Sequence, residues 1–187
     1  MANLLDLFDS KPDSFQYKNN TMVILGDSIN ILKKIKSNSI DLIFADPPYN
    51  IGKEFEKKII PKEEFVQWCK IWIDECFRVL KSNGTFYLMS ATQFMPYLDC
   101  YIDSKYFIRS RIVWFYDSSG VQAKNYFGSL YEPILMIVKD HNHYTFNYKE
   151  IMVEAKTGSK RGLIDYRKPT PQPYNSKKVL GNVWEIP

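Results

Sequence analysis

The tetrapeptide Asp46-Pro47-Pro48-Tyr49 contains the side chains of this sequence that are best suited to chemistry. Both prolines lack a backbone N–H and have a fixed φ, so this loop is rigid and its carbonyls stay free to accept hydrogen bonds. The Asp46 carboxylate and a loop carbonyl can therefore accept the two N–H groups of a planar aromatic amine, while the Tyr49 ring stacks on its face. The tetrapeptide predicts a site for a flat ring that bears an amine.

A nucleobase amine fits this description, and its chemistry explains the need for two acceptors. The exocyclic nitrogen of adenine or cytosine delocalises its lone pair into the ring, which makes it a poor nucleophile. Acceptors that attract both hydrogens favour a pyramidal nitrogen with a directed lone pair. In a duplex this amine is paired, so the base would have to be flipped out of the helix and held by stacking, at a cost of a few kcal/mol.

The segment before the tetrapeptide predicts a strand, a helix and a second strand. The apolar run TMVILGD (21–27) is closed by Gly26, and Ser28 can cap the helical pattern INILKKIK. The run IDLIFA (40–45) has the composition of a strand buried on both faces. Such a βαβ unit is right-handed and belongs to a parallel sheet. Asp46 would then lie at the carboxyl end of a strand, where open α/β sheets bind their ligands.

The remaining chain continues the alternation of helices and strands. Residues 62–81 predict a helix that Asn83-Gly84 ends, and residues 85–90 predict a strand after it. A weaker helix is expected around Pro96, and two long strands over 107–117 and 131–139. The pattern predicts an α/β open sheet. Apolar and sulfur-containing side chains at three- and four-residue steps in the first helix predict its core face: Phe65, Trp68, Trp72, Cys76 and Val79.

Positive charge is concentrated near the carboxyl terminus. Residues 1–155 contain 18 basic and 19 acidic side chains, whereas residues 156–187 contain 7 basic and 2 acidic ones. Basic side chains separated by small residues, as in KTGSKRGLIDYRK, could approach a phosphate backbone closely. The alternative for such a charge run is a solvated loop.

Seven segments together resemble the amino-methyltransferases of DNA, whose N6-adenine members have D-P-P-Y as their catalytic motif. The order of the segments is similar to the β group of this family, in which the catalytic half precedes the cofactor half. The resemblance runs from about residue 21 onward, which suggests an extension at 1–20, a catalytic half at 21–150 and the start of a basic target-recognition or linker region at 151–187. The segments are LGDS, DPPYNIG, RVLKSNGTFYLMS, SRIVWFYDSSGVQAK, YEPILMIVK, EAKTGSKRGLIDYRK and GNVWEIP.

The resemblance implies an α/β fold with the Rossmann-like sheet of S-adenosylmethionine-dependent methyltransferases, acting on double-stranded DNA within restriction-modification. Asp46 and the Pro47 carbonyl would accept from the adenine amine, Pro48 would complete the rigid motif, and Tyr49 would stack on the flipped base. Asp27 would lie near the adenine of S-adenosylmethionine, although on its own it would be assigned to a turn or helix cap. The methyl group would pass directly from sulfur to nitrogen without a metal.

Several residues follow from the resemblance as candidates for contact with DNA or the flipped base. Tyr126 and Phe127 either line the base pocket or are exposed in a loop. The expected DNA contacts are Lys124, Lys156, Lys160, Arg161, Arg167 and Lys168.

One departure from the family is large. The family's cofactor site needs a glycine-rich turn resembling F-x-G-x-G, and none of the 8 glycines here is two residues from another. In the family's sheet, the two strands that accompany this motif lie between the strands ending at Gly26 and Ala45. We therefore expect an incomplete sheet, from a truncated or split enzyme, that binds the cofactor poorly and methylates nothing alone. A complementing C-terminal half or self-association would close the open strand edges.

Two other classes of function stay open at this point. A cytosine-N4 or RNA-amine methyltransferase would share the same chemistry, and a non-catalytic DNA-binding fragment would share the basic segment. No apolar run approaches the roughly 20 residues that cross a bilayer, and the 3 cysteines show no metal-binding spacing. A cytoplasmic protein without a membrane partner or a metal is expected.

Overall fold

The computed structural model describes residues 3–54, 56, 58–117, 124–155 and 162–186. They form two compact units, one of residues 1–145 with 183–187 and one of residues 146–182. The first unit contains a five-stranded mixed sheet with the order β11-β5-β6-β4-β3. Its strands are β3 (Ile40–Ala45), β4 (Leu80–Met89), β5 (Phe107–Phe115), β6 (Tyr131–Val138) and β11 (Val183–Glu185).

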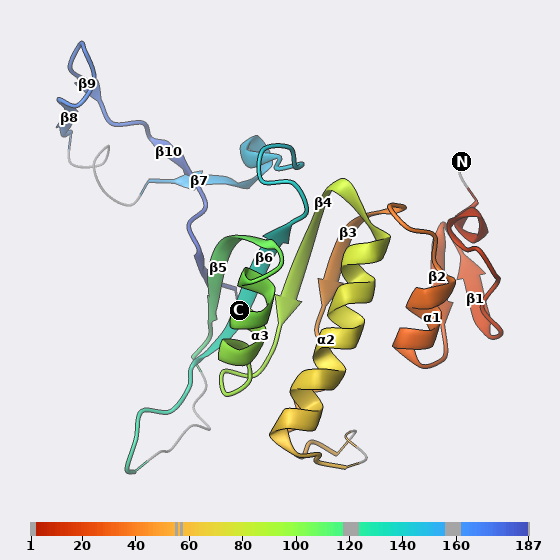
Figure 1. The fold of residues 1–187 in the computed structure, drawn as a ribbon. Coiled ribbons are helices and arrows are strands. Elements are labelled where there is room, and N and C mark those ends of the chain that lie inside the picture. Colours follow the sequence, from red (N-terminus) through yellow and green to blue (C-terminus); the bar gives the residue numbers. More distant parts are fainter. Residues whose placement is uncertain (1–2, 55, 57, 118–123, 156–161, 187) are drawn as a thin grey trace. The chain divides into compact units, whose positions relative to one another are not determined.

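Two helices pack on one face of this sheet, α2 (Lys62–Val79) and α3 (Met95–Asp103) (Figure 1). Side chains from both helices form one core with alternate residues of β4 and β6, which confirms the helical spacing that the sequence shows. Phe77 of α2 stacks on Tyr106 with ring centroids 3.4 Å apart and meets Phe86 of β4 edge-on at 5.6 Å. The α/β class predicted from the sequence is confirmed.

The end of α2 differs from the prediction. The helix ends at Val79, and β4 begins directly at Leu80 and runs through Asn83 and Gly84, which had been assigned to a break between helix and strand. Gly84 lies close to its neighbours in the sheet, where an added Cβ would meet the Asp41 carbonyl oxygen at 3.0 Å. This glycine therefore serves a close backbone approach and does not end a helix.

The amino-terminal strand does not form the predicted βαβ unit with β3. Instead, β2 (Thr21–Ile24) pairs antiparallel with β1 (Phe15–Lys18) in a separate two-stranded sheet, preceded by the 3-10 helix η1 (Leu4–Leu7). The helix α1 (Ser28–Lys34) follows, and its N-cap is Asp27, not Ser28. Residues before position 20 supply β1, so a local hairpin has replaced the long-range parallel pairing.

Strand β3 is the last strand of its sheet, and the prediction that it is buried on both faces is wrong. Leu42 is 59% exposed and Phe44 is 56% exposed. Both side chains lie on one face of the strand, and only β4 pairs with β3 among the described residues. The expectation of an incomplete sheet is confirmed, because this edge is open.

The second unit consists of short elements. Strand β7 (Met152–Glu154) follows the 3-10 helix η2 (Tyr148–Ile151) and pairs antiparallel with β10 (Lys177–Val179). Strand β8 (Ile164–Asp165) pairs with β9 (Gln172–Pro173). Throughout the described parts of both units, no helix has the length and apolar character needed to cross a membrane.

Arg78 of α2 forms hydrogen bonds to the end of α1, and its substitution should destabilise the first unit. Its guanidinium donates to the carbonyls of Leu32 at 2.7 Å and Ile35 at 2.9 Å, and to the Glu75 carboxylate at 2.9 Å. Arg78→Ala leaves the last carbonyls of α1 without these donors, so we expect the free energy of unfolding in urea to fall by about 2 kcal/mol.

Lys81→Ala is the matched control for this prediction. Lys81 pairs with Asp41 at 2.7 Å on the exposed surface, and such pairs contribute about 0.5 kcal/mol. Equal losses from the two substitutions would contradict the bridging role of Arg78.

Candidate active site

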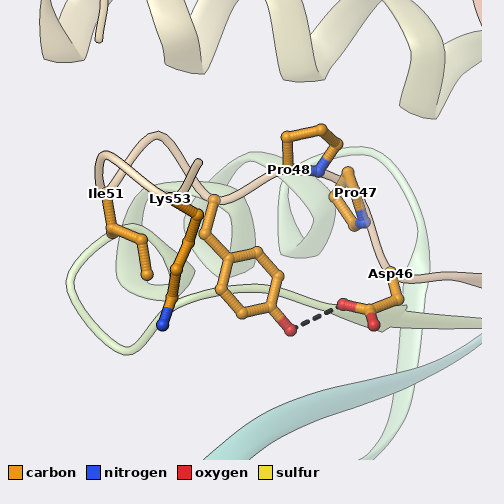
Figure 2. A pocket seen from close by; sticks show the side chains of 6 residues that line it. Asp46, Pro47, Pro48, Ile51 and Lys53 are labelled. Atoms are coloured by element: carbon orange, nitrogen blue, oxygen red, sulfur yellow. Dashed lines mark hydrogen bonds between the residues drawn. The ribbon is translucent and has the colours of Figure 1, made fainter. Parts of the chain in front are cut away.

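The parallel pairing of β3 with β4 places Asp46 at the carboxyl end of both strands. Ala45, the last residue of β3, is the partner of Leu88, one residue before the end of β4. Asp46 and the loop after it line a pocket with a volume of about 260 Å³. Figure 2 shows Asp46 at one end of this loop, with Ile51 and Lys53 at the other. The lining residues are Asp46, Pro47, Pro48, Tyr49, Ile51 and Lys53.

Tyr49 and Asp46 are hydrogen-bonded to each other inside the motif. The Tyr49 hydroxyl donates to Oδ1 of Asp46 at 2.7 Å, the dashed line in Figure 2. Burial, followed by this bond to the carboxylate, raises the pKa of Tyr49 well above its ordinary value. The hydroxyl donates to the carboxylate and orients it with respect to the ring. A ligand amine would bind the remaining acceptor positions of the carboxylate or replace the tyrosine hydroxyl.

The loop after the motif is braced by its own side chains. The buried Asn50 amide donates to the Ile60 carbonyl at 2.8 Å and accepts from the Ile60 N–H at 2.8 Å. The Glu56 carboxylate accepts from four consecutive backbone N–H groups, those of residues 50–53. Asn50 has φ +57° and Gly52 has φ +79°, the left-handed conformation that curls these amides around one anion. The loop is thus held in one shape beside Tyr49.

Two further residues near the motif, Glu132 and Tyr116, were not identified as site residues from the sequence. Glu132 lies near the start of β6, and its carboxylate accepts from the Tyr116 hydroxyl at 3.3 Å. Burial and then the negative charge of Asp46 raise the pKa of Glu132, partly offset by Tyr116 and Lys53. A glutamate at the second position of an otherwise apolar strand was the only signal in the sequence. The position of Glu132 near the motif follows only from the antiparallel pairing, which brings the start of β6 to the edge where β4 ends.

Asp27 does not line this pocket. Its carboxylate caps α1 and accepts from the Asn30 N–H at 2.9 Å. This agrees with the cap assigned from the sequence alone, and the cofactor role remains a prediction. Tyr126 is 75% exposed and Phe127 fully exposed, and neither belongs to the pocket lining.

The candidate DNA contacts divide into described and undescribed residues. Lys124, Arg167 and Lys168 are exposed. Arg167 donates to both oxygens of Asp165, at 2.8 and 3.0 Å, and its guanidinium lies 5.7 Å from the centre of the Tyr174 ring. This pairing lowers the pKa of Asp165 to about 2. Lys156, Lys160 and Arg161 lie outside the described residues.

Comparison with known proteins identifies the family. The sequence profile of the DNA methylase family matches residues 40–187. The chain belongs to the DNA methylase family. It is 58% identical over 167 residues to the DNA adenine methyltransferase YhdJ of Escherichia coli K12. The aligned region covers 88% of this chain and 57% of that protein. The type II methyltransferase M.HpaI of Haemophilus parainfluenzae is 32% identical over 138 residues, 72% of this chain and 44% of that protein.

A solved structure agrees with this fold. The cytosine-N4-specific PvuII DNA methyltransferase superposes with a TM-score of 0.54 and 17% identity, covering 68% of this chain and 52% of that one. The chain thus spans about half the length of the relatives it matches. In the part of the chain that the structure describes, no cluster of three or more His, Cys, Asp or Glu side chains could bind a metal ion.

Asn50 should be needed for the shape of the loop. Asn50→Ala removes the bridge to Ile60 and leaves two backbone groups without their partner, so the free energy of unfolding in urea should fall by about 2 to 3 kcal/mol. Part of this loss would come from the left-handed φ, which alanine adopts at a cost of about 1 kcal/mol.

Asn50→Gly separates these two contributions, because glycine adopts the left-handed φ freely but cannot form the bridge. We expect the glycine variant to recover about 1 kcal/mol relative to the alanine variant and to remain less stable than the natural chain. Full stability of the glycine variant would show that the side-chain bridge contributes nothing.

Proposed function

We propose that this chain is the catalytic part of a site-specific DNA methyltransferase that modifies the N6 amine of adenine. The observation that supports this most directly is the pocket at the carboxyl end of β3, where the Asp46 carboxylate and the Tyr49 ring line one cavity. A flipped base is held by hydrogen bonds to its Watson–Crick edge and by stacking, which a carboxylate and an aromatic ring can provide. The DNA adenine methyltransferase with 58% identity supports adenine as the target.

In this proposal the motif recognises and activates the amine. Asp46 and the Pro47 carbonyl accept its two hydrogens, which favours a directed lone pair on nitrogen. Pro48 keeps the loop rigid, and the Tyr49 ring stacks on the base. The Tyr49 hydroxyl remains protonated and aligns the Asp46 carboxylate, so the acceptor is oriented before the base arrives.

The methyl donor proposed for the family reaction is S-adenosylmethionine, but the residues present do not form a complete site for it. A small-molecule site usually encloses about 300 to 1,000 Å³, more than the pocket of about 260 Å³ at the motif. Asp27 offers a carboxylate, one oxygen of which already caps α1. The sequence has no G-x-G turn to approach the methionine part of the cofactor. We infer that a further polypeptide segment supplies the missing part of the S-adenosylmethionine site.

The open edge at β3 is the proposed place for that polypeptide. Strand β3 pairs only with β4 among the described residues, and open strand edges of this kind pair with additional strands. A complementing C-terminal half or a second copy of the chain would supply the missing neighbour. The C-terminal half would also add the cofactor site beside Asp46, whereas a second copy of the chain would only close the edge.

The basic residues are proposed to contact the phosphates of double-stranded DNA. Arg167 is held by Asp165 and remains well exposed, so its free face can bind a phosphate without losing that pairing. Lys124 and Lys168 add exposed charge, and Lys156, Lys160 and Arg161 are included from the sequence alone. A DNA substrate places the protein in the compartment that contains the DNA, which in bacteria is the cytoplasm.

Labelled methyl transfer tests this function directly. The chain is mixed with unmethylated DNA and methyl-labelled S-adenosylmethionine, with and without the part of the E. coli relative that this chain does not match, and the nucleosides are digested and identified. We expect no label from the chain alone and N6-methyladenine from the mixture. Asp46→Asn should reduce the yield at least 100-fold, the usual order for the loss of an essential catalytic contact.

Asp41→Asn is the matched control, because Asp41 lies on the same strand but pairs with Lys81 on the surface. It should leave the yield unchanged. Label in cytosine, or equal yields from the two aspartate variants, would contradict the proposal.

A further inference from the structure

We infer that Lys53 binds a phosphate that flanks the flipped adenine, and that it thereby holds the sugar–phosphate end of the target nucleotide at the rim of the pocket. This inference rests on the proposed function and adds a contact at the end of the lining loop opposite Asp46. The base amine keeps the acceptors already assigned to it, the Asp46 carboxylate and the Pro47 carbonyl. Lys53 is therefore a substrate-binding residue that takes no part in the methyl transfer itself.

The pocket has opposite charges at the two ends of its lining loop. Asp46 lies at one end of this loop and Lys53 at the other (Figure 2). Lys53 is the one cation among the described residues that line the pocket. An adenine nucleotide has the matching arrangement, because its amine and the nitrogen that bears the sugar lie on opposite sides of the purine. With the amine at Asp46 and the ring on Tyr49, the sugar and its phosphates leave towards the end that Lys53 occupies.

The size of the pocket keeps the phosphates outside it. Its volume of about 260 Å³ is below the range of about 300 to 1,000 Å³ that is usual for sites enclosing a whole small-molecule ligand. The base enters the pocket, and its sugar and phosphates stay at the rim. Lys53 is exposed, and its flexible four-carbon side chain can bring the ammonium group to a phosphate at this rim.

The backbone donors at this end of the loop are already occupied. Successive N–H groups in a curled loop often bind phosphate, and residues 50–53 form such a run. All four of these N–H groups donate to the Glu56 carboxylate, that of Lys53 at 2.9 Å. The Glu56 carboxylate therefore fixes the backbone of Lys53. In the described pocket lining, it leaves the Lys53 ammonium group as the charged donor for a phosphate.

The ammonium group of Lys53 forms no ion pair with a carboxylate among the residues that the structure describes. A phosphate can therefore bind it without displacing a partner. Its charge still acts on the site: burial raises the pKa of Glu132, and Lys53 partly offsets this rise. The negative charges of Asp46 and Glu132 would repel a phosphate, and Lys53 counters that repulsion at the end where the phosphate lies.

A purely structural role for Lys53 would predict something different. If it only offset the nearby carboxylates, its substitution would destabilise the chain or weaken the binding of every ligand equally. The test therefore compares two ligands that differ only in their phosphates. They are deoxyadenosine and deoxyadenosine 3′,5′-bisphosphate, which has both phosphates that flank a nucleotide in DNA.

NMR titration of the chain at low salt measures the dissociation constants of both ligands. We expect the natural chain to bind the bisphosphate about tenfold more tightly than deoxyadenosine, the factor that one charge-assisted hydrogen bond gives. Lys53→Met should reduce this preference to about twofold and leave deoxyadenosine binding and the unfolding temperature unchanged. Lys58→Met is the matched control, because Lys58 is exposed in the same loop and does not line the described pocket. Its preference should remain about tenfold.

The carboxylate of S-adenosylmethionine is another anion that a lysine at the site could bind, and steady-state kinetics separate the two. In the mixture of the chain with the complementing part of the E. coli relative, Lys53→Met should raise the KM for DNA about fivefold. The KM for S-adenosylmethionine and kcat should stay unchanged. A rise in the KM for S-adenosylmethionine alone would assign Lys53 to the cofactor and overturn the inference.

An equal preference in the natural chain and in Lys53→Met would also overturn the inference, as would equal losses in the two lysine variants or the absence of bisphosphate binding to the natural chain. The proposed function fails separately, since it requires N6-methyladenine in the labelling experiment. Formation of N6-methyladenine with an unchanged phosphate preference in Lys53→Met would reject the lysine role alone.

Discussion

The parallel pairing of β3 with β4 is the interaction on which the candidate site depends. It ends both strands at one edge of the sheet, so Asp46 leaves β3 where no further strand covers it. The antiparallel strand β6 returns on the other side of β4 and begins at that same edge, where Glu132 is its second residue. Helices α2 and α3 cover one face of the sheet, and Tyr49 packs against the core that they form with it.

The loop after β3 turns this position into a defined cavity. Two prolines fix the backbone at the point where the strand ends, and Asn50 and Glu56 satisfy the backbone groups of the segment that follows. The aspartate and the tyrosine ring are therefore oriented by covalent constraint and local hydrogen bonds more than by burial. This arrangement suits a site that must accept a base from outside the protein without a large rearrangement.

Local patterns in the sequence predicted the parts of the fold that depend on local contacts. The periodic apolar residues of α2 predicted its core face, and the DPPY tetrapeptide predicted a ligand loop after a strand. The errors all concern contacts between distant segments. The β1–β2 hairpin was missed because residues before position 20 gave no strand signal. The burial of β3 was overestimated because composition does not show what packs on each face of a strand, and Leu42 and Phe44 are exposed. Glu132 was missed because only antiparallel pairing brings it near Asp46.

The central claim is that a flipped adenine binds with its amine at Asp46 and its ring on Tyr49. The most direct test is a crystal structure of the protein, with any polypeptide that completes its sheet, bound to DNA that contains an adenine target. The account predicts an adenine outside the helix, its N6 within hydrogen-bond distance, roughly 3 Å, of the Asp46 carboxylate, and its ring parallel to that of Tyr49. An adenine that remains paired, or one held outside the helix with its amine directed away from Asp46, would contradict it.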